Sequence, residues 1–394
     1  MKRGKEVLKG LWNFEGFSFE DIFKEENRMI IKQKKKGKTG TCPVCKKKRR
    51  KVIEVRERTI RDENISRKKC FILLKTYRIL CKGCYRGMEK LDFILPGERF
   101  TERFAKHIYG LCEKMTLKDA AKECMINWRT AKRIDKKKLK EKFKDLRRVS
   151  PKGIGVDEIA HEKGHKYLTI VRDLDKGVIW VGIGRKEETL NQFFNELGER
   201  KCKKISVAVI DMWDPYIKSI KENTNAEIVF DKFHISKKIN EAVDNIRKRE
   251  FTKADKEERI NMKHKRFLLL YRNKNLNKEQ GKDLNELMRQ NKKLYEAYLL
   301  KEQALNIFER KQRNVALCKL DNWKKNVHES KIKEFAKLLK TLEHYWYGIE
   351  NYFTHHVTNG ASEGYNNKIN VIKRRAYGFK DLEYFKLKIL QSCS

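Results

Sequence analysis

Residues 205–213 have the sequence ISVAVIDMW, which is the pattern of a strand in the middle of a parallel sheet. The run is almost entirely apolar and has strand length, as a strand buried on both faces requires. It ends near Asp211, and a carboxylate in such a place is costly unless it meets a metal ion or a cation. The stretch therefore predicts an α/β domain whose central strand delivers an acidic side chain to a site.

Two other segments present carboxylates in comparable positions. Residues 153–160, GIGVDEIA, predict an upstream strand that delivers Asp157, and residues 362–375, SEGYNNKINVIKRR, predict a helix with Glu363 in its first turn. Divalent ions take oxygen ligands and keep positions open for substrate phosphate. Asp157, Asp211 and Glu363 are therefore candidate catalytic residues of a two-metal phosphoryl-transfer site. For each of them alone, an ordinary strand-end or helix-dipole role is the alternative.

A further acidic residue competes for the third place. Asp231 follows a short apolar strand, so a site of Asp157, Asp211 and Asp231 would bind magnesium without Glu363. His234 stands three residues on and could position water or phosphate there. The simpler interpretation places His234 as an ordinary residue at the start of a helix.

The order of predicted elements is that of an RNase H-like mixed sheet. Strands are expected at 154–159, 167–172, 178–183, 205–212 and 227–230, and helices at 187–200, 215–222 and 235–249. Residues 253–352 carry Leu, Lys, Glu, Asn and Gln at helical spacing and contain no proline. They predict a helical insertion ahead of the closing helix that bears Glu363.

The composition points to a nucleic acid as the partner, and together with the carboxylate site it leads us to expect double-stranded DNA. Lys and Arg number 95 against 54 Asp and Glu, a net charge of +41 that is spread along the whole sequence. Such a charge attracts a polyanion, and binding of this kind weakens steeply with salt. Lysine-rich surfaces of thermophilic proteins normally carry matching glutamates, which are missing here.

The same sequence gives no sign of membrane association. No apolar run approaches the ~20 residues that span a bilayer, and the basic residues 1–10 lack the apolar core of a signal peptide. The ten cysteines do not form a secreted disulfide framework. We therefore expect a cytoplasmic, nucleoid-associated protein.

Four of the cysteines form two Cys-x-x-Cys pairs, each of which places two thiols on a tight turn that a tetrahedral metal accepts. Their gap exceeds the ~15–20 residues of the commonest pattern, so a β-hairpin must bring the pairs together. A redox dithiol or two unrelated turns are the alternatives. Two pairs in one small basic region favour structural Zn²⁺, bound by Cys42, Cys45, Cys81 and Cys84.

Helices expected at 101–114, 116–124 and 128–140 resemble a helix-turn-helix, whose second helix enters the major groove. Residues Thr116 to Asp119 form a capping box that opens the middle helix. An amphipathic hairpin with a solvated face is the alternative. The DNA-binding candidates on one side of the last helix are Arg129, Lys132, Arg133 and Lys136.

The expected domains are a zinc-binding module at 1–96, a helix-turn-helix domain at 97–150 and the first part of the catalytic domain at 151–250. A helical insertion at 251–355 and the closing part of the catalytic domain at 356–394 follow. Near the face of the closing helix lie further DNA-binding candidates: Asn366, Asn370, Lys373 and Arg374.

From Cys42 to Leu390 the chain resembles the DDE insertion-sequence transposases of the ISL-three group. The matching motifs are the cysteine pairs, the helix-turn-helix, GVDEIA, RDLDKG, VIDMWDPY, DKFHISKKINEAVDNIRK and, most specific, ASEGYNNKINVIKRRAYGF. The resemblance implies Asp157, Asp211 and Glu363 as the catalytic triad and Mg²⁺ (or Mn²⁺) as cofactor. It also implies a homodimer or higher oligomer that bridges two terminal inverted repeats.

The leading hypothesis is therefore a transposase that cleaves transposon-end DNA and joins it to target DNA. One alternative is a domesticated, catalytically inactive DNA-binding regulator. Another is an RNase H-like nuclease without strand transfer.

Overall fold

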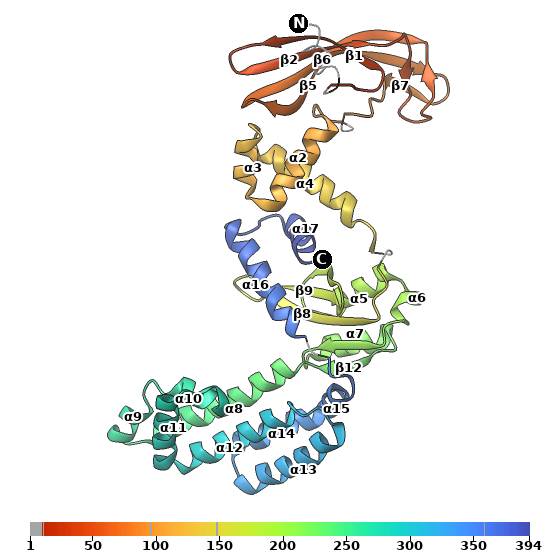
Figure 1. Cartoon of the computed structure of the whole chain (residues 1–394). Coiled ribbons are helices and arrows are strands. Elements are labelled where there is room, and N and C mark those ends of the chain that lie inside the picture. The colour runs from red at the N-terminus through yellow and green to blue at the C-terminus, as the bar shows by residue number, and fades with distance from the viewer. Residues whose placement is uncertain (1–9, 11, 95–96, 147–148, 358) are drawn as a thin grey trace. The chain divides into compact units, whose positions relative to one another are not determined.

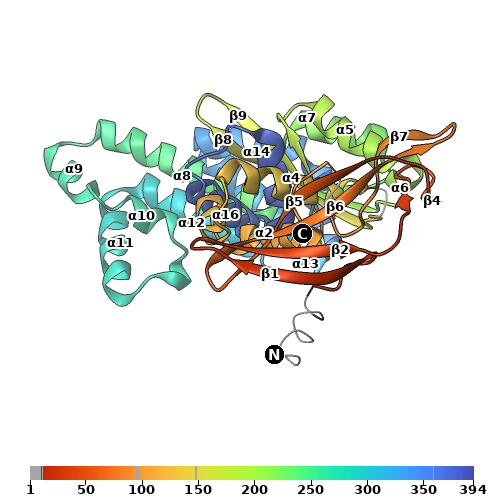
Figure 2. The same cartoon turned by 90° about the horizontal axis from the view of Figure 1, so that it is seen from above.

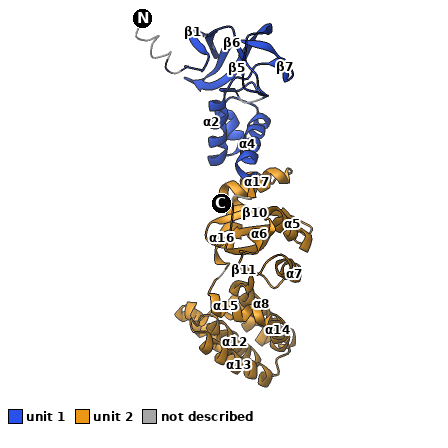
Figure 3. Cartoon of the chain, turned by 90° about the vertical axis from the view of Figure 1, so that its right-hand side faces the viewer, with its two compact units in different colours: residues 1–144 blue, residues 145–394 orange. Residues whose placement is uncertain are grey.

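The computed structural model describes residues 10, 12–94, 97–146, 149–357 and 359–394. The chain divides into two units, Met1–Lys144 and Asp145–Ser394 (Figure 3). Residues 1–9, where no signal peptide is expected, and the expected boundary at residue 96 lie outside the described residues.

The first unit begins with a five-stranded sheet. Its order is β1-β2-β6-β5, and β7 also pairs with β6. The longest strands, β5 and β6, form an antiparallel hairpin, and β6 ends on Cys81, so the hairpin expected between the two cysteine pairs is confirmed. The strands of this unit are β1 (Phe17–Lys24), β2 (Arg28–Lys35), β3 (Gly40–Thr41), β4 (Lys48–Arg49), β5 (Val52–Ile65), β6 (Lys68–Cys81) and β7 (Tyr85–Met88).

Three helices follow, as expected: α2 (Glu102–Lys114), α3 (Leu117–Glu123) and α4 (Trp128–Phe143). The capping residue of α3 is Thr116, whose hydroxyl accepts the Asp119 N–H at 3.2 Å, as the capping pattern predicts. The three helices close around a small apolar core of Phe104, Ala105, Ile108, Cys112, Ala120, Ala121, Cys124, Ala131 and Ile134.

The second unit is built on a mixed sheet of order β10-β9-β8-β11-β12. The first three strands pair antiparallel, whereas β8, β11 and β12 run parallel, so the expected mixed sheet is confirmed. The strands are β8 (Gly153–Glu162), β9 (Lys166–Asp173), β10 (Gly177–Ile183), β11 (Val207–Ile210) and β12 (Glu227–Phe230). The first of them is longer than expected, because β9 pairs with it as far as Glu162.

Helices cover both faces of this sheet (Figure 1). The core on one face includes residues of α5 (Glu187–Leu197) and α7 (Asp214–Asn223). On the other face, α16 (Gly360–Arg375) and α17 (Leu382–Cys393) pack against β8, β9 and β10. The single helix expected over 187–200 is wrong, since Gly198 at φ +90° separates α5 from α6 (Glu199–Cys202).

Every described element from α9 to α15 is a helix, in agreement with the helical pattern of residues 253–352. Figures 1 and 2 show α9, α10 and α11 around the end of α8 that lies farthest from the sheet. The helices are α8 (Lys232–Lys253), α9 (Lys256–Met262), α10 (Arg266–Leu270), α11 (Lys278–Gln290), α12 (Lys292–Ile307), α13 (Arg313–Ser330), α14 (Lys333–His344) and α15 (Trp346–His355), with a 3₁₀ turn η2 (Asn273–Asn275).

The chain then returns to the sheet through α15, which lies close against β12. A Cβ on Gly348 of α15 would stand 2.5 Å from the ring of Phe230, so only glycine allows this approach. The next described helix along the chain is α16, which carries the predicted glutamate.

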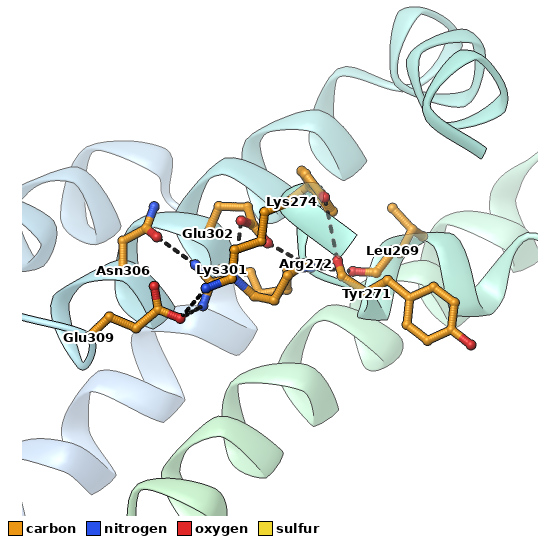
Figure 4. A network of polar contacts seen from close by, with 9 residues as sticks. Leu269, Tyr271, Arg272, Lys274, Lys301, Glu302, Asn306 and Glu309 are labelled. Atoms are coloured by element: carbon orange, nitrogen blue, oxygen red, sulfur yellow. Dashed lines mark hydrogen bonds and ion pairs between the residues drawn. The ribbon is translucent and has the colours of Figure 1, made fainter. Parts of the chain in front are cut away.

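A polar network fastens the segment between α10 and α11 onto α12 (Figure 4). At its centre is Lys301, whose side chain is completely buried. Its ammonium donates to the carbonyl oxygens of Leu269 at 2.8 Å and Tyr271 at 2.5 Å, and it pairs with Glu302 at 3.2 Å. Arg272 Nε pairs with the same glutamate at 3.2 Å. A buried ammonium thus replaces the water that these carbonyls would otherwise need.

We predict that Lys301→Met lowers the free energy of unfolding by about 2 kcal/mol or more, because it withdraws a charged donor from two carbonyls. Urea unfolding followed by circular dichroism measures this loss. The matched control is Lys274→Met, since Lys274 is exposed and its ion pair with Glu309 at 2.7 Å contributes no more than about 1 kcal/mol. Equal losses in the two variants would contradict a central role for Lys301.

Candidate catalytic and zinc sites

Strand register brings three predicted aspartates to one level of the sheet. The strand β11 pairs in parallel with β8 and β12, and its last paired residues are Val209 and Ile210. Continuing this register places Asp211 between Asp157 on one side and Asp231 on the other. Neighbouring strands lie ~4.8 Å apart. Asp157 therefore lies inside β8, at the point where this strand extends beyond β11. It does not lie at the end of its strand, where it was expected.

Asp157 links the sheet to α16. Its Oδ2 accepts a hydrogen bond from Asn366 Nδ2 at 2.9 Å, and its Oδ1 accepts the Glu158 N–H at 2.8 Å. Burial raises the pKa of the Asp157 carboxyl, although both hydrogen bonds act in the opposite direction. Asn366 is one of the predicted DNA-binding residues, and in this structure its side chain orients the Asp157 carboxylate.

Asp211 lies beside the predicted histidine. Its Oδ2 is 3.3 Å from Nδ1 of His234, and its Oδ1 accepts the Met212 N–H at 2.6 Å. His234 belongs to the first turn of α8. The imidazole therefore fixes the orientation of the Asp211 carboxylate from a neighbouring element.

Asp231 is the N-cap of α8 and is only 5% exposed. Its Oδ1 accepts the backbone N–H groups of Phe233 at 3.3 Å and Asn359 at 3.4 Å. The carboxylate thus joins the start of α8 to the residue that precedes α16. Asp231, the alternative third carboxylate of the predicted site, thus has a structural role here.

A buried network sets the start of α16. Arg172 Nε donates to Asn359 Oδ1 at 2.7 Å and to Ser362 Oγ at 3.1 Å, and Ser362 Oγ donates to Asn359 Oδ1 at 2.6 Å. A Cβ at Gly155 would lie 2.6 Å from Asn359 Oδ1, so the network needs a glycine on β8. Sequence reasoning missed Arg172; an arginine inside an apolar strand is the signal that marks it. The network ends one residue before Glu363.

Glu363 lies in the first turn of α16 and is exposed. The N-cap of this helix is Asn359, and Ser362 lies inside the helix and is buried. Among the described residues, only the four predicted zinc ligands form a group of three or more His, Cys, Asp or Glu side chains whose ligand atoms lie within 4.8 Å of one another. Asp157, Asp211 and Glu363 do not form such a group in this structure. The structure therefore presents Glu363 at the surface, on the helix that contacts Asp157.

The other DNA candidates on α16 are divided between the sheet and the surface. Lys373 Nζ donates to the carbonyl oxygen of Ala160 at 3.2 Å, on β8. Asn370 is half-buried, and Arg374 is exposed while its Nε reaches the Asn370 carbonyl at 3.4 Å. Arg374 is thus the best exposed cation of this group.

Sequence reasoning also missed Arg185. Its guanidinium lies between the rings of Tyr167, at 4.2 Å, and Trp213, at 4.9 Å, and pairs with Glu158 at 3.6 Å. Burial raises the pKa of Glu158, and the neighbouring aspartate charges add to this. A fixed cation therefore stands beside the acidic strand ends, and one of the two rings that contact it, Trp213, lies two residues after Asp211.

The four predicted zinc ligands come together. All four sulfur atoms lie within 4.8 Å of one another, with Cys42 to Cys84 and Cys45 to Cys81 at 3.7 Å. A tetrahedron with Zn–S distances of about 2.3 Å has edges of about 3.8 Å, so the spacing fits Zn²⁺. The backbone N–H of Lys47 lowers the pKa of Cys45 to about 6, which supplies a thiolate.

The last helix of the first unit carries the four predicted basic residues at different exposures. Arg129 and Arg133 are exposed, whereas Lys132 and Lys136 are half-buried. The guanidinium of Arg133 pairs with Glu98. Arg129 follows the exposed ring of Trp128 in the first turn of α4, at the end that a recognition helix directs toward base edges.

Three family models match in order along the chain. A zinc-finger of transposase IS204/IS1001/IS1096/IS1165 matches residues 38–84, and a helix-turn-helix domain of transposase family ISL3 matches residues 89–137. A model described as the transposase itself, of the ISL3 group, matches residues 154–389, which is more than half of the chain. The chain belongs to the ISL3 family of transposases.

Relatives agree with this assignment. The transposase for insertion sequence element IS1001 of Bordetella parapertussis is 29% identical over 98% of this chain and 97% of its own length. The transposase for insertion sequence element IS1557 of Mycobacterium tuberculosis is 28% identical over 65% of this chain and 63% of its own length. The expected family, the helix-turn-helix and the zinc module are confirmed, and no helix in the described ranges could cross a membrane.

For this ISL3-family transposase we predict that Cys42→Ser with Cys45→Ser removes one zinc ion per chain and unfolds the cysteine module. Sequence-specific DNA binding should then be lost while the second unit keeps its unfolding transition. Elemental analysis and limited proteolysis measure the two effects. The control is Cys318→Ser at an exposed cysteine. Specific binding that survives loss of the metal would refute a structural role for zinc.

We further predict that Asp157→Asn raises the melting temperature of the second unit at pH 8 without added Mg²⁺. The folded pKa of Asp157 lies above its ordinary value of 3.8, so the ionised carboxylate costs stability at higher pH and the cost disappears below that value. The gain should vanish as the pH falls toward 4. Exposed Asp175→Asn should show no such gain, and a lower melting temperature for Asp157→Asn at pH 8 would contradict the argument.

Proposed function

We propose that this chain binds the ends of a transposable element and cleaves and joins their strands by phosphoryl transfer, with Asp157, Asp211 and Glu363 as catalytic residues. The observation that carries the proposal is the parallel register that sets Asp157 and Asp211 level on adjacent strands. Asn366 ties α16, the helix of Glu363, to the first of these carboxylates.

We assign the second unit to the RNase H-like class. Support comes from the antiparallel β10-β9-β8 meander followed by parallel β11 and β12, with helices on both faces. In this assignment residues 151–250 and 356–394 make the catalytic domain and residues 251–355 are a helical insertion. Residues 1–96 and 97–150 are the zinc module and the helix-turn-helix domain.

The acidic residues have the donor set that magnesium takes. Two Mg²⁺ (or Mn²⁺) ions would be held by Asp157, Asp211 and Glu363, whose ligand atoms are all oxygen. When bound, such ions activate the attacking water or 3′-hydroxyl and stabilise the leaving oxygen. Asp231, as the cap of α8, supports this site rather than binding metal.

The chain's own residues position these carboxylates. His234 orients Asp211 through its Nδ1, and Asn366 orients Asp157. The Arg172 network fixes the first turn of α16 and hence the place from which Glu363 approaches. All of these contacts join groups of the chain itself, which is the kind of positioning that catalysis by orientation requires.

DNA would be held by separate groups in each unit. Arg129, with Lys132, Arg133 and Lys136 behind it, would read the transposon ends from the major groove. Asn370, Lys373 and Arg374 on α16 would hold backbone phosphates of the strand that is cut. Two inverted repeats require two copies, so we propose a homodimer or higher oligomer on DNA, working at the nucleoid. The net charge of +41 supports binding to both end and target DNA.

The decisive test is excision and integration from a plasmid that carries this gene between its native flanks. Wild type should give joined products, and Glu363→Gln should give none, a loss of about a hundredfold or more in rate, because a two-metal site needs its third carboxylate. Exposed Glu329→Gln is the charge-matched control. Cut but unjoined products from wild type would favour a nuclease, and specific binding without any product would favour a regulator.

Asp211→Asn adds a second readout to the same experiment. Cleavage should be lost while DNA affinity stays equal or rises, since a carboxylate repels phosphate. Weak DNA binding by this variant, measured by gel shift, would make Asp211 a structural residue.

A further inference from the structure

The end of α16 contains a tyrosine in a position that favours glycine. The Gly378 N–H donates to the Lys373 carbonyl and the Tyr377 N–H donates to the Arg374 carbonyl, both at 3.0 Å. These two bonds define a Schellman motif, whose left-handed residue is here Tyr377 at φ +51°. A side chain in that conformation brings Cβ close to the following carbonyl oxygen. The glycine of this turn, Gly378, stands one position too late to avoid the strain.

The ring of Tyr377 gains nothing from packing in return. It is 101% exposed, whereas the next most exposed large apolar side chain of the described residues, Ile260, is 66% exposed. A strained backbone and a fully solvated aromatic ring both oppose the folded state of this turn. A non-glycine residue in this conformation whose ring packs on nothing is a candidate functional position.

The chain on either side of Tyr377 is rich in cationic residues. The last turn of α16 consists of Lys373, Arg374 and Arg375, and exposed Lys380 follows the motif. An aromatic face beside arginine and lysine is the combination that binds a nucleic acid strand, because the cations hold phosphates while the ring stacks on a base. An apolar pocket of a protein partner would not call for this charge.

Only some bases in DNA can accept such a ring. A base inside a duplex already stacks on neighbours above and below, so its faces are covered. An unpaired base, or one separated from its neighbour by an inserted side chain, offers a free face. The chemistry therefore selects an unstacked nucleobase as the ligand.

We propose that Tyr377 stacks on an unstacked nucleobase of the bound DNA, with Arg374 and Lys380 holding the adjacent phosphates. The proposal rests on the proposed function, since it takes the strand near Glu363 as the one that reaches Tyr377. The rise along α16 separates the two residues by about 20 Å. A DNA strand that runs along α16 and rises about 3.4 Å per nucleotide would place the stacked base about six nucleotides from the phosphate at Glu363.

The test uses the full-length protein and a duplex that carries the element's own terminal repeat and flank, without added Mg²⁺ so that no strand is cut. 5-Iododeoxyuridine is placed singly at successive positions within ten nucleotides of the cleavage site. This base cross-links on irradiation to an aromatic ring stacked on it. We expect one position, about six nucleotides from the cut, to cross-link to Tyr377, as identified by mass spectrometry.

Matched variants separate stacking from helix capping. Tyr377→Phe should keep the cross-link and the affinity, and Tyr377→Leu should lose the cross-link and weaken binding about tenfold. Tyr377→Gly should weaken binding equally without lowering the melting temperature, because glycine relieves the left-handed strain. Unchanged binding by the Leu and Gly variants, or an affinity loss without any cross-link to Tyr377, would overturn the proposal.

Two other outcomes are distinguishable. A wild-type chain that shows the cross-link but never cuts DNA would refute the proposed catalysis and leave the stacking intact. A Tyr377→Leu chain that binds DNA normally but no longer self-associates would overturn the stacking in favour of an interface between copies.

Discussion

The parallel pairing of β11 between β8 and β12 is the constraint on which the second unit depends. Four residues of β11, almost all buried, are enough to set the register with both neighbours. Because side chains alternate along a strand, a shift by one residue would turn Asp157 away from α16. The hydrophobic pattern of the buried strand thus specifies chemistry at its end, where Asp211 follows Ile210.

The second requirement is that α16 meets the sheet at a fixed point, and a buried arginine provides it. Arg172 donates a hydrogen bond to Asn359, which lies far from it in the sequence, and Gly155 leaves the space that both side chains need. Burial lowers the pKa of the Arg172 guanidinium, so its hydrogen bonds must offset a real desolvation cost. A buried cation that is satisfied by amide and hydroxyl oxygens leaves the carboxylates of the site free for other partners.

Whether a feature of the fold or the site could be predicted depends on how far apart in the sequence its interacting residues lie. Asp211 and the hairpin between Cys42 and Cys84 could be predicted from local patterns. The first follows an apolar run of strand length, and the second joins two Cys-x-x-Cys pairs. The length of β8 could not be predicted in this way, because it depends on pairing with β9. The Asn359 cap of α16 is equally hidden, since its partners Arg172 and Asp231 lie far from it in the sequence. Even so, the sequence motif placed Glu363 in the correct turn of the correct helix.

The long helix α8 has a mechanical consequence. Its first turn holds His234 against Asp211, and its later turns pack against α10, α12 and α14. At 1.5 Å per residue it is a rod about 33 Å long. Over such an arm a sideways displacement of about 0.6 Å at the far end tilts the first turn by only about one degree. The imidazole of His234 therefore changes its orientation very little when the distant helices move.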